Sequence, residues 1–148
     1  MRLEGKTAIV TGGASGFGEG IVRKFISEGA QVMIADINGS AATKLADELG
    51  AMAFTVDVSD GASVQAMVEV AAQTFGTPDI VVNNAGITHL PQMAEDVTED
   101  DFDRVFAVNC KSVYLTARAF VPMMKKRGSG AFLNIASKVF SAMMWVFS

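Results

Sequence analysis

Short runs of apolar residues alternate along the chain with longer stretches in which apolar residues recur every three or four positions. The runs have the length of buried strands, and the recurrent pattern is typical of helices that bury one face. Strands are predicted at residues 7–10, 31–35, 53–56, 79–83 and 131–135. Helices are predicted between them. This alternation predicts an α/β fold, a doubly wound parallel sheet with helices on both faces.

The two longest predicted helices show the pattern most clearly. From Val64 to Phe75 the apolar residues follow the i, i+3, i+4, i+7 spacing, and Gly76 ends the helix. A longer helix is predicted from Thr98 to residue 126, with the Thr98 side chain capping its first turn near Asp101.

Composition narrows the possible functions. The chain has 148 residues, of which 50% are hydrophobic and 19% charged, as expected for one packed domain. A net charge of −4 offers no basic surface for nucleic acid or for an anionic membrane. One cysteine and one histidine exclude a disulfide framework and a Cys/His metal cluster. Without a signal peptide or a membrane-spanning run, a cytoplasmic location is expected.

A glycine-rich turn lies where the first predicted strand meets the first helix. Gly12, Gly16 and Gly18 occupy it, in the pattern Gly-x-x-x-Gly-x-Gly. Pyrophosphate binds backbone amides at a helix N-terminus, and side chains at such a turn would keep it away. The strand–turn–helix context therefore predicts a phosphate-binding turn in a Rossmann-type domain.

Asp36 ends the second predicted strand, eighteen residues after Gly18. A carboxylate at this place accepts hydrogen bonds from the ribose hydroxyls of a dinucleotide. It also repels a 2′-phosphate, by about 4 kcal/mol for two unit charges at ~4 Å and an effective dielectric constant of ~20. Neither Ile37 nor the glycine-rich turn supplies a cation. Asp36 therefore predicts a preference for NAD over NADP, with a solvated loop carboxylate as the alternative.

Two further segments end strands at the same edge of the predicted sheet. Asp57 and Val58 follow the third strand, and Asn84, Ala85 and Gly86 follow the fourth. Ligands of open α/β sheets bind outside the carboxyl ends of the strands, so both segments point to one crevice. Asp57 is equally explained as a turn former or a helix cap.

Asn109 lies on the apolar stripe of the longest helix, among residues such as Phe102, Phe106 and Phe120. A buried asparagine without a partner costs about 1–3 kcal/mol, so its amide has to be hydrogen-bonded. One interpretation is a structural hydrogen bond to a neighbouring element. The other is a helix perturbed at this point to hold a water or a catalytic group. The sequence leaves both open.

Together these motifs resemble the short-chain dehydrogenase/reductase family. The matching segments, in order, are residues 11–18, Asp36, Asp57-Val58, residues 83–86, Asn109 and residues 134–137. The resemblance covers residues 1–137 as a dinucleotide-binding domain and implies an NAD(H)-dependent oxidoreductase acting on a secondary alcohol or ketone.

The resemblance also implies a role for each matched residue. Asp36 binds the adenosine ribose, and Asp57 and Val58 lie at the adenine edge. Asn109 anchors a water in a proton relay, and Ser137 positions the reacting substrate oxygen. The pyrophosphate lies among Gly12, Ser15, Gly16, Phe17 and Gly18, and a ribose lies beside Asn84, Ala85 and Gly86.

The family pattern ends at Ser137. The family's catalytic tyrosine, with a lysine four residues on, follows that serine, whereas this chain continues into an apolar tail at 138–148. Its one tyrosine, Tyr114, precedes the serine and is followed at the lysine spacing by Arg118. We interpret this pair as a coincidence, since arginine does not replace lysine geometry.

Two explanations fit the tail, and two functions fit the chain. A truncation or frame change explains the ending best, leaving the sheet incomplete at its C-terminal side; a natural short form is the alternative. The 148-residue chain is therefore predicted to be inactive, either as the cofactor-binding half of a dehydrogenase or as a non-catalytic NAD-binding module. The exposed edge at residues 131–135 and the tail also predict a homo-oligomer.

Overall fold

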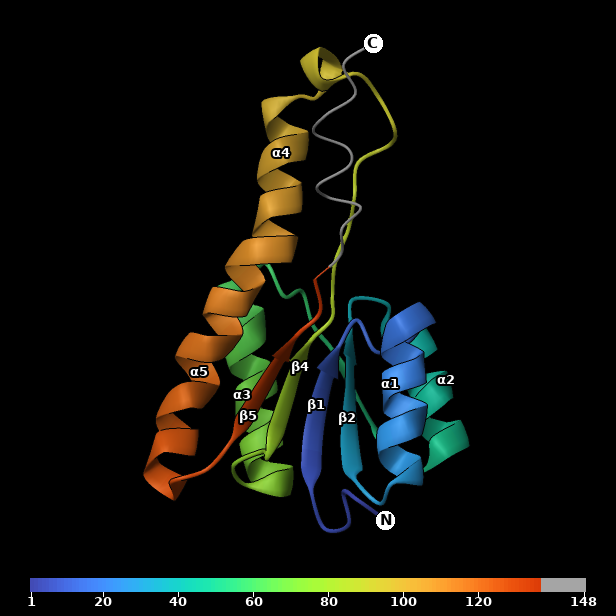
Figure 1. The fold of residues 1–148 in the computed structure, drawn as a ribbon, viewed down its shortest axis with the longest axis vertical. Coiled ribbons are helices and arrows are strands. Elements are labelled where there is room, and N and C mark those ends of the chain that lie inside the picture. Colours follow the sequence, from blue (N-terminus) through green and yellow to red (C-terminus); the bar gives the residue numbers. More distant parts are fainter. Residues whose placement is uncertain (137–148) are drawn as a thin grey trace.

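The computed structural model describes residues 1–136, and within them five parallel strands form one sheet (Figure 1). The strands lie in the order β3-β2-β1-β4-β5. Their bounds are β1 Thr7–Thr11, β2 Gln31–Asp36, β3 Met52–Thr55, β4 Ile80–Asn83 and β5 Ala131–Asn134. The doubly wound Rossmann-type fold expected from the sequence is confirmed, with strand bounds within a residue of those predicted.

Helices cover both faces of the sheet (Figure 1). Helices α1 (Gly16–Ser27) and α2 (Gly39–Leu49) cover one face, and α3 (Gly61–Phe75) and α5 (Ser112–Arg127) cover the other. Successive strand residues point to opposite faces, so Ile9 packs toward α3 and α5 while Ala8 and Val10 pack toward α1 and α2. This two-sided burial explains why the strands are almost continuously apolar.

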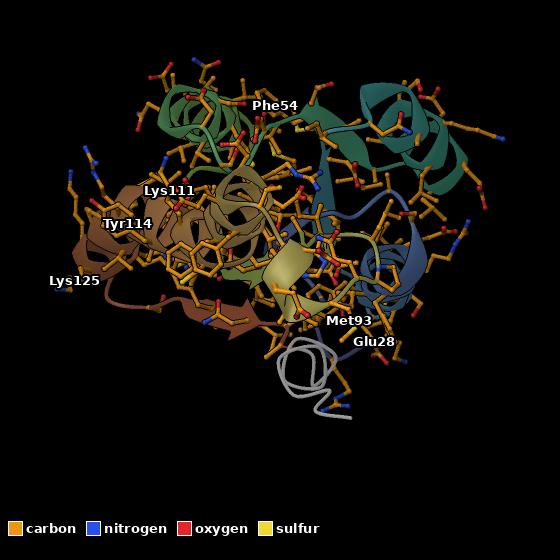
Figure 2. All side chains as sticks on the ribbon, turned by 90° about the horizontal axis from the view of Figure 1, so that it is seen from above. Glu28, Phe54, Met93, Lys111, Tyr114 and Lys125 are labelled. Atoms are coloured by element: carbon orange, nitrogen blue, oxygen red, sulfur yellow. The ribbon has the colours of Figure 1, made fainter. Side chains whose placement is uncertain are left out.

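The long helix is interrupted. Helix α4 (Glu99–Phe106) passes through a π-helical turn, η2 (Ala107–Lys111), into α5, and a short 3₁₀ helix, η1 (Ala94–Asp96), precedes it. The predicted cap is confirmed, because the Asp101 amide donates to Thr98 Oγ1 at 3.1 Å. Lys111, at the end of η2, and Tyr114, in α5, are labelled in Figure 2, and both are exposed.

The expectation that Phe102 and Phe106 face the core is wrong. Their side chains are 57% and 49% exposed, although Val105 between them is buried. Helix α4 extends past the strand ends, so no sheet lies beneath these rings (Figure 1). They stack on each other instead, with ring centroids 6.0 Å apart.

In the described residues no helix is both long and apolar enough to span a membrane.

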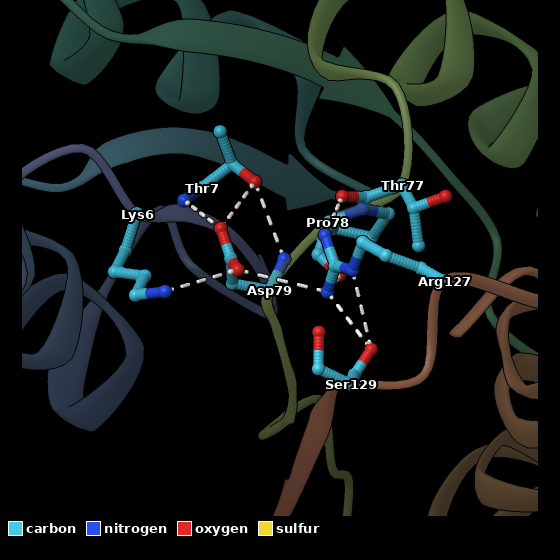
Figure 3. Close-up of polar contacts among 7 residues, drawn as sticks. All are labelled: Lys6, Thr7, Thr77, Pro78, Asp79, Arg127 and Ser129. Carbon is cyan, nitrogen blue, oxygen red and sulfur yellow. Dashed lines mark hydrogen bonds and ion pairs between the residues drawn. The ribbon is translucent and has the colours of Figure 1, made fainter. Parts of the chain in front are cut away.

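Asp79 joins the strands at the amino-terminal edge of the sheet (Figure 3). Its Oδ2 accepts hydrogen bonds from the Thr7 amide at 2.9 Å and the Thr7 hydroxyl at 3.2 Å. Its Oδ1 lies 3.4 Å from Lys6 Nζ and 3.6 Å from Arg127 Nη2. Burial raises the pKa of Asp79, but the Thr7 hydrogen bonds and the two positive charges outweigh it, and the pKa is lowered.

Arg127, at the end of α5, extends this cluster to the next connections (Figure 3). Its guanidinium donates to the carbonyls of Thr77 and Pro78, and to that of Ser129 at 3.0 Å. One side chain thus ties the segment before β4 to the turn before β5. The planar five-donor group of arginine is suited to several carbonyls at once.

Candidate functional site

A cavity of about 360 Å³ opens at the carboxyl ends of the strands. It lies where ligands of open α/β sheets bind. Among the predicted cofactor residues, those that line it are Gly12, Ser15, Phe17, Gly18, Asp36, Asp57, Val58, Asn84, Ala85 and Gly86. Gly16 and Asn109 lie beside it rather than in its wall, and Ser137 lies outside the described residues.

Sequence reasoning missed an apolar part of the wall. It consists of Ala35, Ile37, Val56, Ile87 and Val108. All five directly adjoin a predicted site residue in sequence, which is the signal that would have found them. An apolar wall with a few polar groups is typical of nucleotide sites.

The glycine-rich turn needs its glycines for two reasons. Gly12 has φ +61°, and a Cβ there would stand 2.8 Å from Ala85 Cα. A Cβ on Gly18 would collide with the carbonyl oxygen of Gly12 and stand 2.6 Å from Asn84 Nδ2. At these two positions the turn packs against the end of β4 with no room for a side chain.

Helix α1 begins without a side-chain cap at this cavity. Helices α2, α3 and α4 begin with capping side chains, Asn38, Asp60 and Thr98, each accepting a first-turn amide. The corresponding residue of α1, Ser15, is extended at φ −155°, and its side chain caps nothing within the described part of the chain. The first amides of α1 are left for an anion, which the helix dipole favours.

Thr11 connects the glycine-rich turn to the end of β4. Its buried hydroxyl donates to the Val82 carbonyl at 3.2 Å and accepts from the amides of Asn84 and Ala85, both at 3.1 Å. Asn84 Nδ2 in turn donates to the carbonyls of Thr11 and Gly12. These bonds fix both loops of the site relative to each other. The sequence placed Thr11 in the motif but gave it no role.

Asp36 holds two loops by its two carboxylate oxygens. Oδ2 accepts from the Ala14 amide at 3.0 Å, and Oδ1 accepts from the Asn38 amide at 2.9 Å. Within residues 1–136 no lysine, arginine or histidine forms an ion pair with it. Each oxygen keeps acceptor capacity. Two backbone amides therefore orient the Asp36 carboxylate at the cavity wall, and its role toward a ribose stays a prediction.

Asn109 lies in the middle of the π-helical turn and binds one residue twice. Its Oδ1 accepts from the Ile87 amide and its Nδ2 donates to the Ile87 carbonyl, each at 2.8 Å. The structural hydrogen bond and the perturbed helix that the sequence posed as alternatives both occur. Because Ile87 lines the cavity, Asn109 fixes its wall. Its part in a water relay stays a prediction.

A chain of polar side chains that begins at the buried Thr116 links α5 to the last two strands. The Thr116 hydroxyl donates to Asn83 Oδ1, and Asn83 Nδ2 donates to Asn134 Oδ1, both at 2.8 Å. Asn83 and Asn134 are paired in the sheet register. This chain fixes the end of β5, two residues before the described part of the structure ends.

Comparison with known proteins identifies the family. The short chain dehydrogenase profile matches residues 6–146. This range reaches into residues 138–148, which the motif comparison left out, so the proposed division at 137 stays a prediction.

Among curated proteins, the chain is 46% identical over 142 residues to a 4-formylbenzenesulfonate dehydrogenase of Comamonas testosteroni, covering 93% of this chain and 56% of that protein. It is 39% identical to a D-threitol dehydrogenase of Mycolicibacterium smegmatis, covering 93% and 55%. The chain thus spans about half the length of the curated relatives it matches.

Among solved structures, a 3-ketoacyl-(acyl-carrier-protein) reductase of Brucella melitensis complexed with NADH has 46% identity and a TM-score of 0.89. The match covers 92% of this chain and 59% of that one. Motifs, fold and profile agree, and the chain belongs to the short-chain dehydrogenase/reductase family.

Proposed function

We propose that the cavity binds NAD(H), and that the chain is the cofactor-binding part of an oxidoreductase acting on a secondary alcohol or ketone. The observation that carries the proposal is the uncapped N-terminus of α1 beside a glycine-rich turn that packs closely on the end of β4, with the Asp36 carboxylate in the same cavity wall. When bound, the nicotinamide ring accepts or donates the hydride.

Different residues at the cavity are assigned to different parts of the cofactor. Asp36 accepts from the adenosine ribose, and Asp57 and Val58 contact the adenine. The first amides of α1, which no side chain of the described residues caps, bind the pyrophosphate. The pyrophosphate residues are Gly12, Ser15, Gly16, Phe17 and Gly18, and those of the second ribose are Asn84, Ala85 and Gly86.

The preference for NAD(H) over NADP(H) tests the assignment of Asp36. A 2′-phosphate at the ribose would face a carboxylate with no cation paired to it, so the affinity for NADH exceeds that for NADPH at least about tenfold, roughly 1.4 kcal/mol. Titrating the chain with each cofactor measures the ratio. Support comes from the Brucella reductase, whose structure contains NADH.

The variant Asp36→Ala reduces this ratio by removing the repulsion of the 2′-phosphate. It also frees the amides of Ala14 and Asn38, so both affinities fall and the ratio, not either affinity alone, is the measure. Equal affinities for the two cofactors in the unmutated chain contradict the assignment.

Catalysis is the point on which two functions diverge. In the first, Asn109 anchors a water of the proton relay and Ser137 positions the substrate oxygen, as in a dehydrogenase. In the second, the chain binds NAD(H) without turnover, which the absence of a Tyr-x-x-x-Lys segment after Ser137 favours for these 148 residues. General acid catalysis typically raises the reaction rate by ~10²–10⁴-fold, so its loss would be visible in a turnover assay. A turnover assay on a panel of secondary alcohols, run beside the titration, separates the two.

We also infer that the chain self-associates. β5 is an edge strand of the described sheet; Leu133 within it is 45% exposed, and Ile135 just after it is 43% exposed. Exposed apolar edges favour association. Light scattering is expected to show a dimer or larger species. A monomer at micromolar concentration, unchanged by deletion of 139–148, contradicts a role for that segment.

A further inference from the structure

We infer that Ser59 is a positioning residue for adenine recognition: it orients the carboxylate of Asp57 so that the site distinguishes adenine from a purine without a 6-amino group. The inference rests on the proposed binding of NAD(H) and adds a determinant of base specificity to it. It comes from the loop between β3 and α3, where four hydrogen bonds join residues of one short segment.

Ser59 holds one oxygen of Asp57 with two donors. The Ser59 amide donates to Asp57 Oδ1 at 2.9 Å, and the Ser59 hydroxyl donates to the same oxygen at 2.6 Å. Short bonds to a carboxylate are the stronger kind. The Asp57 side chain is exposed, so without these bonds its rotamers would interconvert freely.

The backbone of Asp57 is held as well. Its amide donates to Ser63 Oγ at 3.0 Å, and Ser63 lies in the first turn of α3. The neighbouring carboxylate, Asp60, is occupied, because its Oδ2 caps α3 by accepting from the Ser63 amide at 2.7 Å. Of the two carboxylates in this loop, Asp57 alone lines the cavity.

The second oxygen of Asp57 is left as the acceptor for a ligand. In the described part of the chain Oδ2 receives no hydrogen bond, whereas Oδ1 receives two. A carboxylate only accepts, so it selects a ligand group that donates. The 6-amino group of adenine donates; the 6-oxo group of hypoxanthine accepts and would stand against the carboxylate. Val56, Val58 and Ile37 supply apolar surface around the same part of the cavity.

Preorganisation makes Ser59 matter although it need not touch the base. A carboxylate already held in its binding rotamer loses little entropy when the ligand arrives. Once the hydroxyl is removed, the Ser59 amide alone holds Oδ1, so the carboxylate samples other rotamers and the base loses part of its specific acceptor. Apolar contacts, which do not distinguish adenine from hypoxanthine, remain.

The test compares two dinucleotides on four proteins. NADH and reduced nicotinamide hypoxanthine dinucleotide are titrated into the full chain, Ser59→Ala, Ser59→Thr and Ser27→Ala. The last is the matched control, because the Ser27 hydroxyl donates to the Lys24 carbonyl at the other end of α1, outside the cavity wall. Urea unfolding of each protein reports stability separately.

The unmutated chain is expected to prefer NADH at least about tenfold, as for a hydrogen bond to a charged group. Ser59→Ala reduces this preference to about threefold or less, while Ser59→Thr and Ser27→Ala keep it. If Ser59→Ala lowers the affinity for both dinucleotides by the same factor, so that the preference is unchanged, the inference is overturned. An unmutated chain that binds both equally also overturns it. If the unmutated chain binds neither dinucleotide, the proposed function itself is overturned.

Discussion

Asp36 and Asp79 lie at opposite edges of the same sheet, and both carboxylates accept hydrogen bonds from backbone amides. Asp36, at the end of β2, binds the amides of Ala14 and Asn38, and within residues 1–136 it has no ion-pair partner. Asp79, before β4, binds Thr7 and lies within 4 Å of two cations.

The difference separates function from stability. At the amino-terminal edge the cations of Lys6 and Arg127 neutralise Asp79 and tie three segments of chain together. At the carboxyl edge the polar groups point into a cavity and keep acceptor or donor capacity. The charge of a carboxylate that is paired with cations is already neutralised, whereas a carboxylate held only by amides keeps its charge and its acceptor capacity for a ligand.

The largest expected effect is at the carboxyl edge. In Gly18→Ala the new methyl group collides with the Gly12 carbonyl, so the turn shifts away from the end of β4. We expect NADH binding to be lost and the free energy of unfolding to fall by about 1–3 kcal/mol. Titration and urea unfolding measure the two effects.

Gly20→Ala is the matched control on the same helix. A Cβ at Gly20 meets nothing within 4 Å, and alanine favours a helix over glycine by ~1 kcal/mol. This variant is expected to bind NADH normally and to be slightly more stable. Normal NADH affinity in Gly18→Ala would show that the turn is not the phosphate site.

The next effect is at the amino-terminal edge, where one substitution can be made at both carboxylates. Asp79→Asn leaves Arg127 without its ion pair and weakens the bonds from Thr7, so the free energy of unfolding falls by about 1.5–3 kcal/mol. NADH affinity stays unchanged. Asp36→Asn costs about 1 kcal/mol for one lost amide bond, and narrows the preference for NADH over NADPH. A larger loss of stability in Asp36→Asn, together with a changed cofactor preference in Asp79→Asn, would refute the comparison.

The pH dependence of unfolding tests the same cluster independently. The pKa of Asp79 in the folded chain lies below its ordinary value of 3.8, so the unfolded chain binds the proton more readily. The contribution of Asp79 is therefore complete above that value and is lost as the pH falls through the folded pKa. Urea unfolding between about pH 5 and pH 3 is expected to show a steeper loss for the unmutated chain than for Asp79→Asn.

The sequence predicted the local features of this fold well. The strands, their parallel sheet and the cap at Thr98 depend on residues close in sequence or on the alternation of elements, and the structure has them. The glycine-rich turn was recognisable because strand, turn and helix adjoin. The predicted part of the cavity wall followed from the rule that strand ends meet at one edge, whereas its apolar part was missed.

Features that depend on distant partners were not predictable. A perturbed helix at Asn109 was one of two interpretations, but its hydrogen-bond partner Ile87 lies 22 residues earlier and no periodicity in the helix marks it. Phe102 and Phe106 follow the apolar stripe, but the sequence does not show that the sheet ends before it reaches them. Asp79 was visible only as the start of a strand, since its partners Lys6 and Arg127 lie far away in the chain.

The smallest expected effect sharpens the comparison, because Thr116 lies near the carboxyl edge yet serves stability. Its hydroxyl is fully buried and donates to Asn83 Oδ1 at 2.8 Å. Thr116→Val keeps the shape but leaves that oxygen without its donor, so the free energy of unfolding falls by about 1 kcal/mol with NADH affinity unchanged. Thr43→Val, which removes an exposed hydroxyl on α2, is expected to change neither. If Thr116→Val instead lowered NADH affinity at unchanged stability, the edge of the sheet alone would separate the two roles. With the expected result, burial and prior pairing of a polar group decide its role, even when it lies near the carboxyl edge of the sheet.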